Sequence, residues 1–202
     1  MPLFTDTRFK NLEIVNGGIF YMKATGIVRR IDDLGRIVIP KEIRRVLRIR
    51  ESDPIEIFTD KDGQVILQKY SPLGDLMEVA ENFADALASV CGHMVLIADR
   101  DVYIAAAGGA KAYLGKPIGK AAEDKIHARE TLITSEGERN FVNVCEEVQE
   151  DIRHEALMPI ICQGDIVGGV VFLEKDPKKR MTEADTKLLQ AAVSFLGKQI
   201  EH

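Results

Sequence analysis

Long apolar runs are absent from this 202-residue sequence. No stretch approaches the roughly 18 apolar residues of a membrane-spanning helix, which excludes a protein of that kind. The first residues also lack an apolar segment behind a basic start, so no secretory signal is expected. Cysteine is scarce and odd in number, with Cys91, Cys145 and Cys162 far apart. We therefore expect free thiols in a reducing cytoplasm rather than a disulfide framework.

Motifs of catalysis and metal binding are missing as well. No Gly-x-Gly-x-x-Gly occurs, and the glycines between Gly109 and Lys116 are spaced wrongly for a phosphate-binding loop. Cys91 and His93 provide two possible metal ligands, but no partner pair with zinc-site spacing follows them. The sequence therefore predicts no catalytic residues, no cofactor and no metal site.

The charge of the chain is unevenly distributed. The net charge is −5, yet residues 22–50 hold nine Lys and Arg against three Asp and Glu, whereas residues 74–202 are acidic overall. A basic patch at one end of an acidic protein is typical of contact with a polyanion. Ser71, Pro72 and Gly74 mark a boundary in the chain. We therefore predict a small basic domain over residues 22–72 and a larger domain over residues 73–202.

Residues 1–21 show no pattern of a folded element and are interpreted as a leader. Asn16, Gly17 and Gly18 precede Met22 closely, and Gly-Gly codons can resemble a ribosome-binding site. We hypothesise that translation starts at Met22; the alternative is a genuine disordered extension.

The basic domain is predicted to be rich in strands. We expect strands over residues 24–31 and 36–39 around an Asp/Gly turn, a helix over 41–48 that begins after Pro40, and a hairpin of strands 55–59 and 64–70. The strand at Ile37–Ile39 is apolar on both faces, and some 50 residues bury little core by themselves. Two copies are therefore expected to complete each other's core as a dimer.

The helix predicted at 41–48 concentrates positive charge. At helical spacing Lys41, Arg44, Arg45 and Arg48 share one face, opposite an apolar face. Like charges three and four residues apart repel, and a polyanion would neutralise them. A solvated helix face is the alternative, but arginines on the neighbouring strands at positions 29, 30 and 36 favour nucleic acid.

The segment KATGIVRRIDDLGRIVIPKEIRRVLRIRESDPIEIF, residues 23–58, closely resembles the AbrB/MazE swapped-hairpin DNA-binding domain. The resemblance implies an interlaced dimeric β-barrel that binds double-stranded DNA. It also implies that the site depends on DNA shape, with a loose, AT-rich preference. Carried over to matching positions, the DNA contacts are Arg29, Arg30, Arg36, Arg44 and Arg45, with Lys23 and Lys41 as weaker candidates.

The second domain combines helices and strands. Leu76, Ala80, Phe83, Leu87 and Val90 form a heptad-like seam. Strands are expected at 94–98 and 102–106, a helix at 121–129, an edge strand at 141–144, and a hairpin of strands 157–162 and 166–174. Thr182 is expected to cap a final helix with a broad apolar face.

This pattern resembles a GAF domain, and the whole chain resembles a family of sporulation regulators of spore-forming Firmicutes. The predicted fold is α+β with two domains, a swapped-hairpin AbrB-like barrel followed by an α/β GAF-like domain. The resemblance implies a cytoplasmic, nucleoid-associated regulator that activates and represses forespore genes. It further implies a homotetramer joined by GAF helices and an unknown small molecule or protein at the GAF-like domain.

Two other functions compete with this interpretation. One is a MazE-like antitoxin component; such proteins carry a short disordered tail, whereas about 130 residues with strands and capped helices follow the basic domain here. The other is a GAF-fold redox enzyme that uses its cysteines, for which no catalytic constellation is evident.

Overall fold

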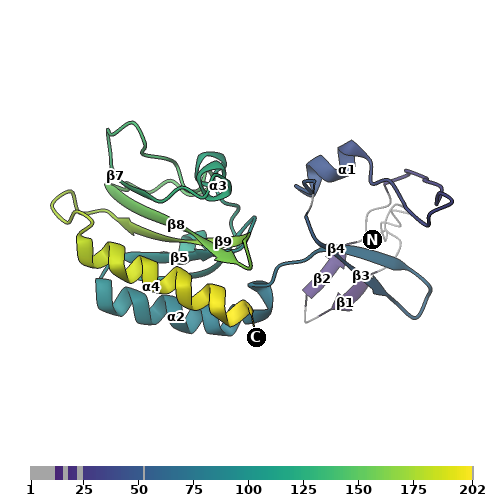
Figure 1. The fold of residues 1–202 in the computed structure, drawn as a ribbon, viewed down its shortest axis with the longest axis horizontal. Helices are drawn as coiled ribbons and strands as arrows, with labels where there is room; N and C mark the ends of the chain where they lie inside the picture. The colour runs from purple at the N-terminus through teal and green to yellow at the C-terminus, as the bar shows by residue number, and fades with distance from the viewer. Residues whose placement is uncertain (1–11, 16–17, 22–24, 52, 202) are drawn as a thin grey trace, which may run out of the picture. The chain divides into compact units, whose positions relative to one another are not determined.

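The computed structural model describes residues 12–15, 18–21, 25–51 and 53–201 (Figure 1). The chain divides into two compact units, Met1–Arg50 and Glu51–His202. None of the helices in the described part of the chain combines the length and apolar composition of a membrane span.

The first unit begins with an antiparallel hairpin of β1 (Leu12–Val15) and β2 (Gly18–Tyr21), in which Leu12 pairs with Tyr21 and Ile14 with Ile19. The expectation of no folded element is therefore wrong for residues 12–15 and 18–21, whereas the interpretation of residues 1–21 as a leader stays a prediction. The dipeptide that separates the strands in the sequence, Asn16-Gly17, is the one most typical of two-residue hairpins. Met22 lies outside the described residues, so a translation start there stays a prediction.

The strands expected at residues 24–31 and 36–39 are not formed within the single chain. The described residues of both segments have no ladder partner, and only the turn between them is closed, by hydrogen bonds from Asp32 N to Arg36 O (3.1 Å) and from Gly35 N to Asp32 O (3.0 Å). A strand needs a neighbour to satisfy its backbone groups. The prediction of strands fails because no segment among the described residues provides that neighbour.

The second unit starts with the expected hairpin of β3 (Ile55–Thr59) and β4 (Val65–Lys69), an isolated two-stranded sheet. Asp60 organises its turn, since its Oδ1 accepts the backbone N–H groups of Asp62 (2.9 Å) and Gln64 (2.7 Å). Gly63 supplies the left-handed conformation that closes the turn (φ +80°).

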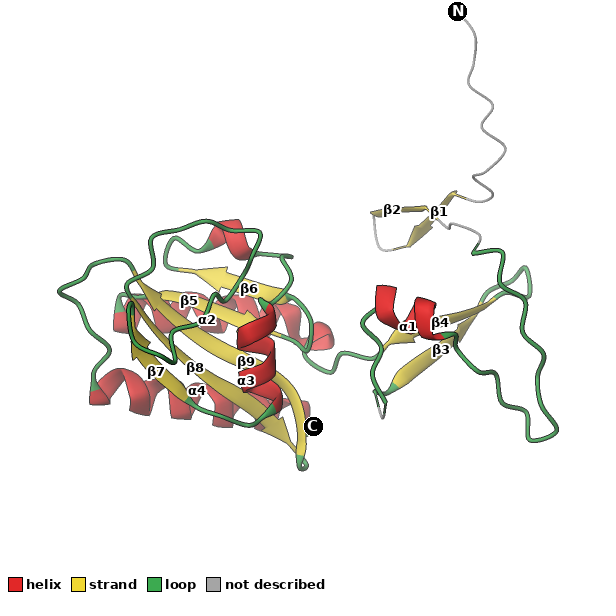
Figure 2. Ribbon diagram, turned by 90° about the horizontal axis from the view of Figure 1, so that it is seen from above, coloured by secondary structure: helices red, strands yellow, loops and turns green. Residues whose placement is uncertain are grey.

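The rest of the second unit is a five-stranded antiparallel sheet with the order β6-β5-β9-β8-β7 (Figure 2). Its elements are, in chain order, η1 (Gly74–Leu76), α2 (Met77–Cys91), β5 (Met94–Ala98), β6 (Tyr103–Ala107), η2 (Lys111–Tyr113), α3 (Lys120–His127), β7 (Leu132–Ser135), β8 (His154–Cys162), β9 (Asp165–Glu174) and α4 (Glu183–Ile200).

The sheet separates two apolar clusters. Helices α2 and α4 lie side by side on one face, where their side chains pack with Val95, Ile97 and Phe172 (Figure 1). Helix α3 contacts β8 and β9, and the cluster that contains its Ile126 also holds Leu157. Because every residue of β5 is buried, this strand has the continuous apolar sequence of a strand covered on both faces.

The edge strand expected at residues 141–144 is wrong; the sheet ends instead at β7, which pairs with β8. Residues 141–144 cross the face of the sheet as a loop. The N–H of Val142 donates to Glu155 Oε1 (2.7 Å), and the carbonyl of Val144 accepts from the hydroxyl of Tyr103 (2.7 Å). Side chains therefore satisfy the backbone groups that a ladder would have used.

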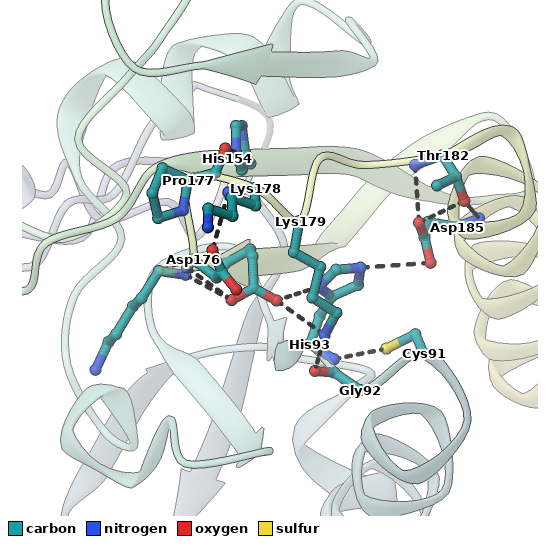
Figure 3. A network of polar contacts seen from close by, with 12 residues as sticks. Cys91, Gly92, His93, His154, Asp176, Pro177, Lys178, Lys179, Thr182 and Asp185 are labelled. Carbon is teal, nitrogen blue, oxygen red and sulfur yellow. Dashed lines mark hydrogen bonds and ion pairs between the residues drawn. The ribbon is translucent and has the colours of Figure 1, made fainter.

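A buried polar network fixes the ends of α2 and α4 against the sheet (Figure 3). His93 Nδ1 lies 2.8 Å from Glu174 Oε2, and its Nε2 lies 3.5 Å from Asp185 Oδ1. Lys179 pairs with Glu174 (3.0 Å) and donates to the carbonyl of Gly92 at the end of α2. Asp185 also completes the capping box with Thr182 that the sequence predicted for the start of α4.

Candidate nucleic-acid interface

The turn after the first extended segment holds Arg36 in a defined position. Asp32 Oδ1 accepts the backbone N–H groups of Leu34 (3.0 Å) and Arg36 (2.7 Å), and Asp32 Oδ2 accepts the Nε–H of Arg36 (2.8 Å). Gly35 takes the left-handed conformation that this turn requires (φ +75°). The backbone and side-chain hydrogen bonds from Arg36 lower the pKa of Asp32, so this carboxylate stays ionised beside the arginine.

Helix α1 (Lys41–Val46) carries three of the predicted contacts on one face. Successive residues of a helix turn by about 100°, so Lys41, Arg44 and Arg45 fall within one third of its circumference. All three side chains are exposed. Pro40 precedes the first turn and its carbonyl accepts the N–H of Arg44 (3.0 Å), as expected for a proline at a helix start.

Arg48 does not belong to this cationic face, contrary to the expectation of a helix over residues 41–48. The N–H of Ile49 donates to Arg44 O (2.7 Å) and that of Arg48 to Arg45 O (3.4 Å), a Schellman motif that ends the helix at Val46. Arg48 occupies the left-handed position of the motif (φ +52°). That position is usually Gly or Asn, so nothing in the sequence marked the end of the helix.

The other predicted contacts lie on extended segments. Arg29, Arg30 and Arg36 are exposed, on either side of the Asp32 turn, and Arg36 alone has an internal acidic partner among the described residues. The structure thus gathers three cations on α1 and leaves three on the segments that lack a strand partner. Lys23 lies outside the described residues.

The cysteines and histidines form no metal site in the part of the chain that the structure describes, where no three His, Cys, Asp or Glu side chains are grouped to hold an ion. Cys145 and Cys162 are buried and Cys91 is half-buried. Burial raises the pKa of the Cys91 thiol, which leaves it in its unreactive protonated form at neutral pH.

Two family descriptions match the chain and meet at residue 75. "Stage V sporulation protein T C-terminal, transcription factor" matches residues 75–201, and "Antidote-toxin recognition MazE, bacterial antitoxin" matches residues 28–75.

Individual relatives agree with this division. Stage V sporulation protein T of Bacillus subtilis (strain 168) is 50% identical over 181 residues, which are 89% of this chain and 99% of that protein. Transition state regulatory protein AbrB of the same organism is 47% identical over 76 residues, 38% of this chain and 78% of that protein. The GAF domain of an Acinetobacter phosphoenolpyruvate-protein phosphotransferase shares the fold with a TM-score of 0.54 at 14% identity, covering 67% of this chain and 85% of that one.

An exposed cationic module of AbrB type joined to a GAF-like α/β domain defines a class of DNA-binding transcription regulators, which confirms the predicted α+β two-domain fold. Within that class, the chain belongs to the stage V sporulation protein T family. The prediction of a DNA-binding regulator of sporulation is thereby confirmed. Membership of a transcription-factor family also agrees with the expectation of a non-enzymatic role.

Proposed function

We propose that two copies of this chain interlace their basic domains into one DNA-binding dimer, and that the GAF-like domains join two dimers into a tetramer. The dimer presents the arginines at positions 29, 30, 36, 44 and 45, with Lys41 and Lys23, to the phosphates and groove edges of double-stranded DNA. Its preference is for deformable, AT-rich sites. Such binding places the protein at the nucleoid, in the cytoplasm.

The exposure of apolar side chains in the basic domain carries this proposal. Thirteen large apolar residues between Ile27 and Tyr70 are exposed in the single chain, against six in the longer stretch of residues 71–201. Val28 is 85% exposed, Val38 71% and Val46 76%. Burial of apolar surface contributes about 25 cal/mol per Å², so a domain that leaves this much unburied needs a partner. A second copy that pairs with residues 25–31 and 36–39 would supply both the strand neighbours and the cover.

The positive face of α1 supports DNA as the ligand of that dimer. Lys41, Arg44 and Arg45 have no acidic partner among the described residues, although they repel one another at helical spacing. Phosphate groups on one face of a duplex would neutralise all three, and guanidinium groups bind phosphate through two parallel hydrogen bonds.

Helices α2 and α4 support the tetramer. The predicted seam is divided, because Ala80 and Leu87 pack on the domain's own sheet whereas Val90 is exposed. Phe83 lies against Phe195 of α4 with ring centroids 4.6 Å apart, and Phe195 remains partly exposed. An apolar strip across the two helices is thus available to a second copy, and the His93 network holds the helices in place to present it.

The central test replaces both helix arginines. Arg44→Ala with Arg45→Ala should weaken DNA binding at least about a hundredfold, since each protomer loses two charge-assisted phosphate contacts. The matched control, Arg139→Ala with Arg180→Ala, removes equal charge from the GAF-like domain and should leave affinity unchanged. Gel-shift titration measures both, and circular dichroism checks the fold. Retained affinity in the first variant would place the contact face elsewhere.

The tetramer is tested by removing residues 75–202. The remaining domain should be a dimer by light scattering and should bind DNA more weakly, because linked dimers raise each other's effective concentration. A tetramer that survives this truncation would rule out the role of the GAF-like domain. A MazE-like antitoxin would instead need its C-terminal region to bind a toxin. The C-terminal region of this chain is folded, which favours a regulator with an intact second domain.

A further inference from the structure

A cavity of about 560 Å³ lies on the α3 face of the sheet, under the loop that replaced the expected edge strand. A volume of this size is typical of small-molecule sites. Its walls come from the end of η2, from the loop between β7 and β8, and from β8 itself. Its apolar lining is formed by Phe141, Val142, Val144, Val148 and Ile152.

Glu155 is the unusual residue of this cavity. It lies on β8, and its side chain faces the same apolar layer as Leu157 two residues along the strand. The residue is only 1% exposed, and its one hydrogen bond among the described residues is the 2.7 Å contact from Val142 N to Oε1. The second oxygen therefore has no partner in the described part of the chain. Burial, opposed by that single hydrogen bond, raises the pKa of Glu155 to about 7.

The other acids of the lining differ from Glu155 because each pairs with a cation that does not itself line the cavity. Glu136 and Asp151 both pair with Arg153. Glu150 pairs with Lys175 through Oε1 (3.1 Å), but its Oε2 is buried with no partner.

Tyr113 completes this acidic end of the cavity. Burial, followed by the negative charge of Glu150, raises the pKa of Tyr113, so its hydroxyl stays protonated. A protonated phenol can donate a hydrogen bond but cannot balance a negative charge.

No Lys or Arg is among the residues that line the cavity. A carboxylate or phosphate ligand would therefore enter beside buried acids with no cation to receive it, which costs free energy. A ligand with positive charge and hydrogen-bond donors would instead satisfy the unpartnered oxygens of Glu150 and Glu155.

We propose that this cavity binds a small organic cation, in which an alkylammonium or amidinium group contacts Glu155 and Glu150 and an apolar part packs against the valines of the loop. This proposal rests on the regulatory function proposed above and on the small molecule expected at the GAF-like domain, and it names the chemistry of that molecule. A purely structural Glu155, kept to anchor Val142, is the alternative. A glutamine would accept the same N–H without a buried acid, so anchoring alone does not account for the carboxylate.

The test titrates the full-length protein, without DNA, with three ligands that share one apolar chain. These are hexylammonium chloride, 1-hexanol and potassium hexanoate, measured by calorimetry at pH 8, where Glu155 is ionised. Hexylammonium should bind at least about tenfold more tightly than hexanol, and hexanoate more weakly than either. Glu155→Gln should lower hexylammonium affinity to that of hexanol and leave hexanol binding intact, which shows that the cavity is still folded.

The matched control is Glu147→Gln, which removes an exposed carboxylate from the same loop outside the cavity and should change nothing. Hexanoate binding as tight as hexylammonium, no binding of any ligand, or unchanged affinity in Glu155→Gln would each overturn the proposal. So would magnesium chloride binding that depends on Glu155, which would assign the site to a metal ion. Arg44→Ala with Arg45→Ala should leave hexylammonium binding unchanged, so failure of DNA binding and failure of this site are distinguishable.

Discussion

The two halves of this protein treat apolar residues in opposite ways. Between residues 27 and 70 the strand and helix positions that should form a core are exposed, whereas between residues 75 and 201 the sheet is covered on both faces. The second region buries its apolar residues within the single chain. The first forms its local turns and the β3–β4 hairpin, but its segments 25–31 and 36–39 have no ladder partner among the described residues. If two copies interlace as proposed, folding and association of the basic domain are one process.

The largest effect on the contrast between the two regions is expected from a charge introduced into the exposed segment of residues 36–39. Val38→Asp should abolish the dimer and with it DNA binding, because a carboxylate would be buried without a partner between two copies. Analytical ultracentrifugation of residues 22–72 measures the dimer, and gel shift measures the binding. Leu114→Asp, at an apolar position that is also exposed but in the GAF-like domain, is the control for the gel shift of the full chain and should be neutral there. A stable dimer of the Val38 variant would mean that this surface is not the interface.

Truncation of a core side chain should lower the stability of the second region without affecting the dimer of the basic domain. Leu157 is fully buried in β8, and Leu157→Ala should destabilise the GAF-like domain by about 2–5 kcal/mol through lost apolar contact and the cavity left behind. Ile161→Ala, on the same strand but partly exposed, should cost less than about 1 kcal/mol. Urea unfolding of residues 73–202 gives both values. Equal losses would indicate that β8 is not the centre of a packed core.

The stability of the second region should also depend on pH through Glu155. Its pKa is about 7 when folded and near 4.5 when unfolded, so between these values a rise in pH ionises only the unfolded chain and stability falls. The loss is complete above pH 7 and amounts to about 3 kcal/mol. Glu155→Gln removes it, so relative to wild type the variant should gain stability between pH 5 and pH 8. Parallel pH profiles in urea unfolding would contradict the buried, unpaired state of this carboxyl.

The smallest effect is expected at the β8–β9 turn. Gln163 and Gly164 both have positive φ, of 49° and 88°, and Cys162 pairs with Asp165, which defines a two-residue turn. Asn tolerates this conformation better than Gln, so Gln163→Asn should stabilise the domain by less than about 1 kcal/mol. Gln190→Asn, at an exposed position of α4, should have the opposite sign because Asn is the weaker helix former. A melting temperature lowered by Gln163→Asn would contradict the turn geometry.

Most elements of the second region follow from sequence patterns, because each pattern reports contacts made within the chain. The strand Met94–Ala98 was predicted with the bounds observed, and the Thr182 cap was predicted as found. The edge strand at 141–144 failed because its backbone groups are satisfied by Glu155 and Tyr103, residues distant in sequence that no local pattern links to it. Apolar alternation in a segment therefore does not distinguish a strand from a loop packed on a sheet, because it does not report which groups satisfy the backbone.

In the basic domain, sequence patterns predict the charged residues but not the secondary structure of the single chain. Its cationic residues are evident from composition and spacing, and the six that the structure describes are all exposed. The strands 24–31 and 36–39 were expected from their sequence, but the described residues of both segments have no ladder partner in the described part of the chain. Arg48 was assigned to the helix face because its left-handed conformation occurs without the usual glycine. The boundary between residues 72 and 73 and the list of DNA contacts stay predictions.

The ion pair between Asp32 and Arg36 has a consequence for how binding responds to ionic strength. A cation that neutralises a DNA phosphate releases condensed counterions, which gives the logarithm of affinity a slope of about −0.9 per phosphate against the logarithm of salt concentration. If Arg36 contacts DNA as proposed, Asp32 already offsets part of its charge through the contact with Nε–H, and this carboxylate would remain beside the duplex. Arg36 should therefore add less to the salt slope than Arg44 or Arg45, although all three are arginines of one domain. Asp32→Asn, which keeps a side-chain oxygen for the turn, should make the protein bind DNA more tightly in dilute buffer and lose that affinity more steeply as salt rises.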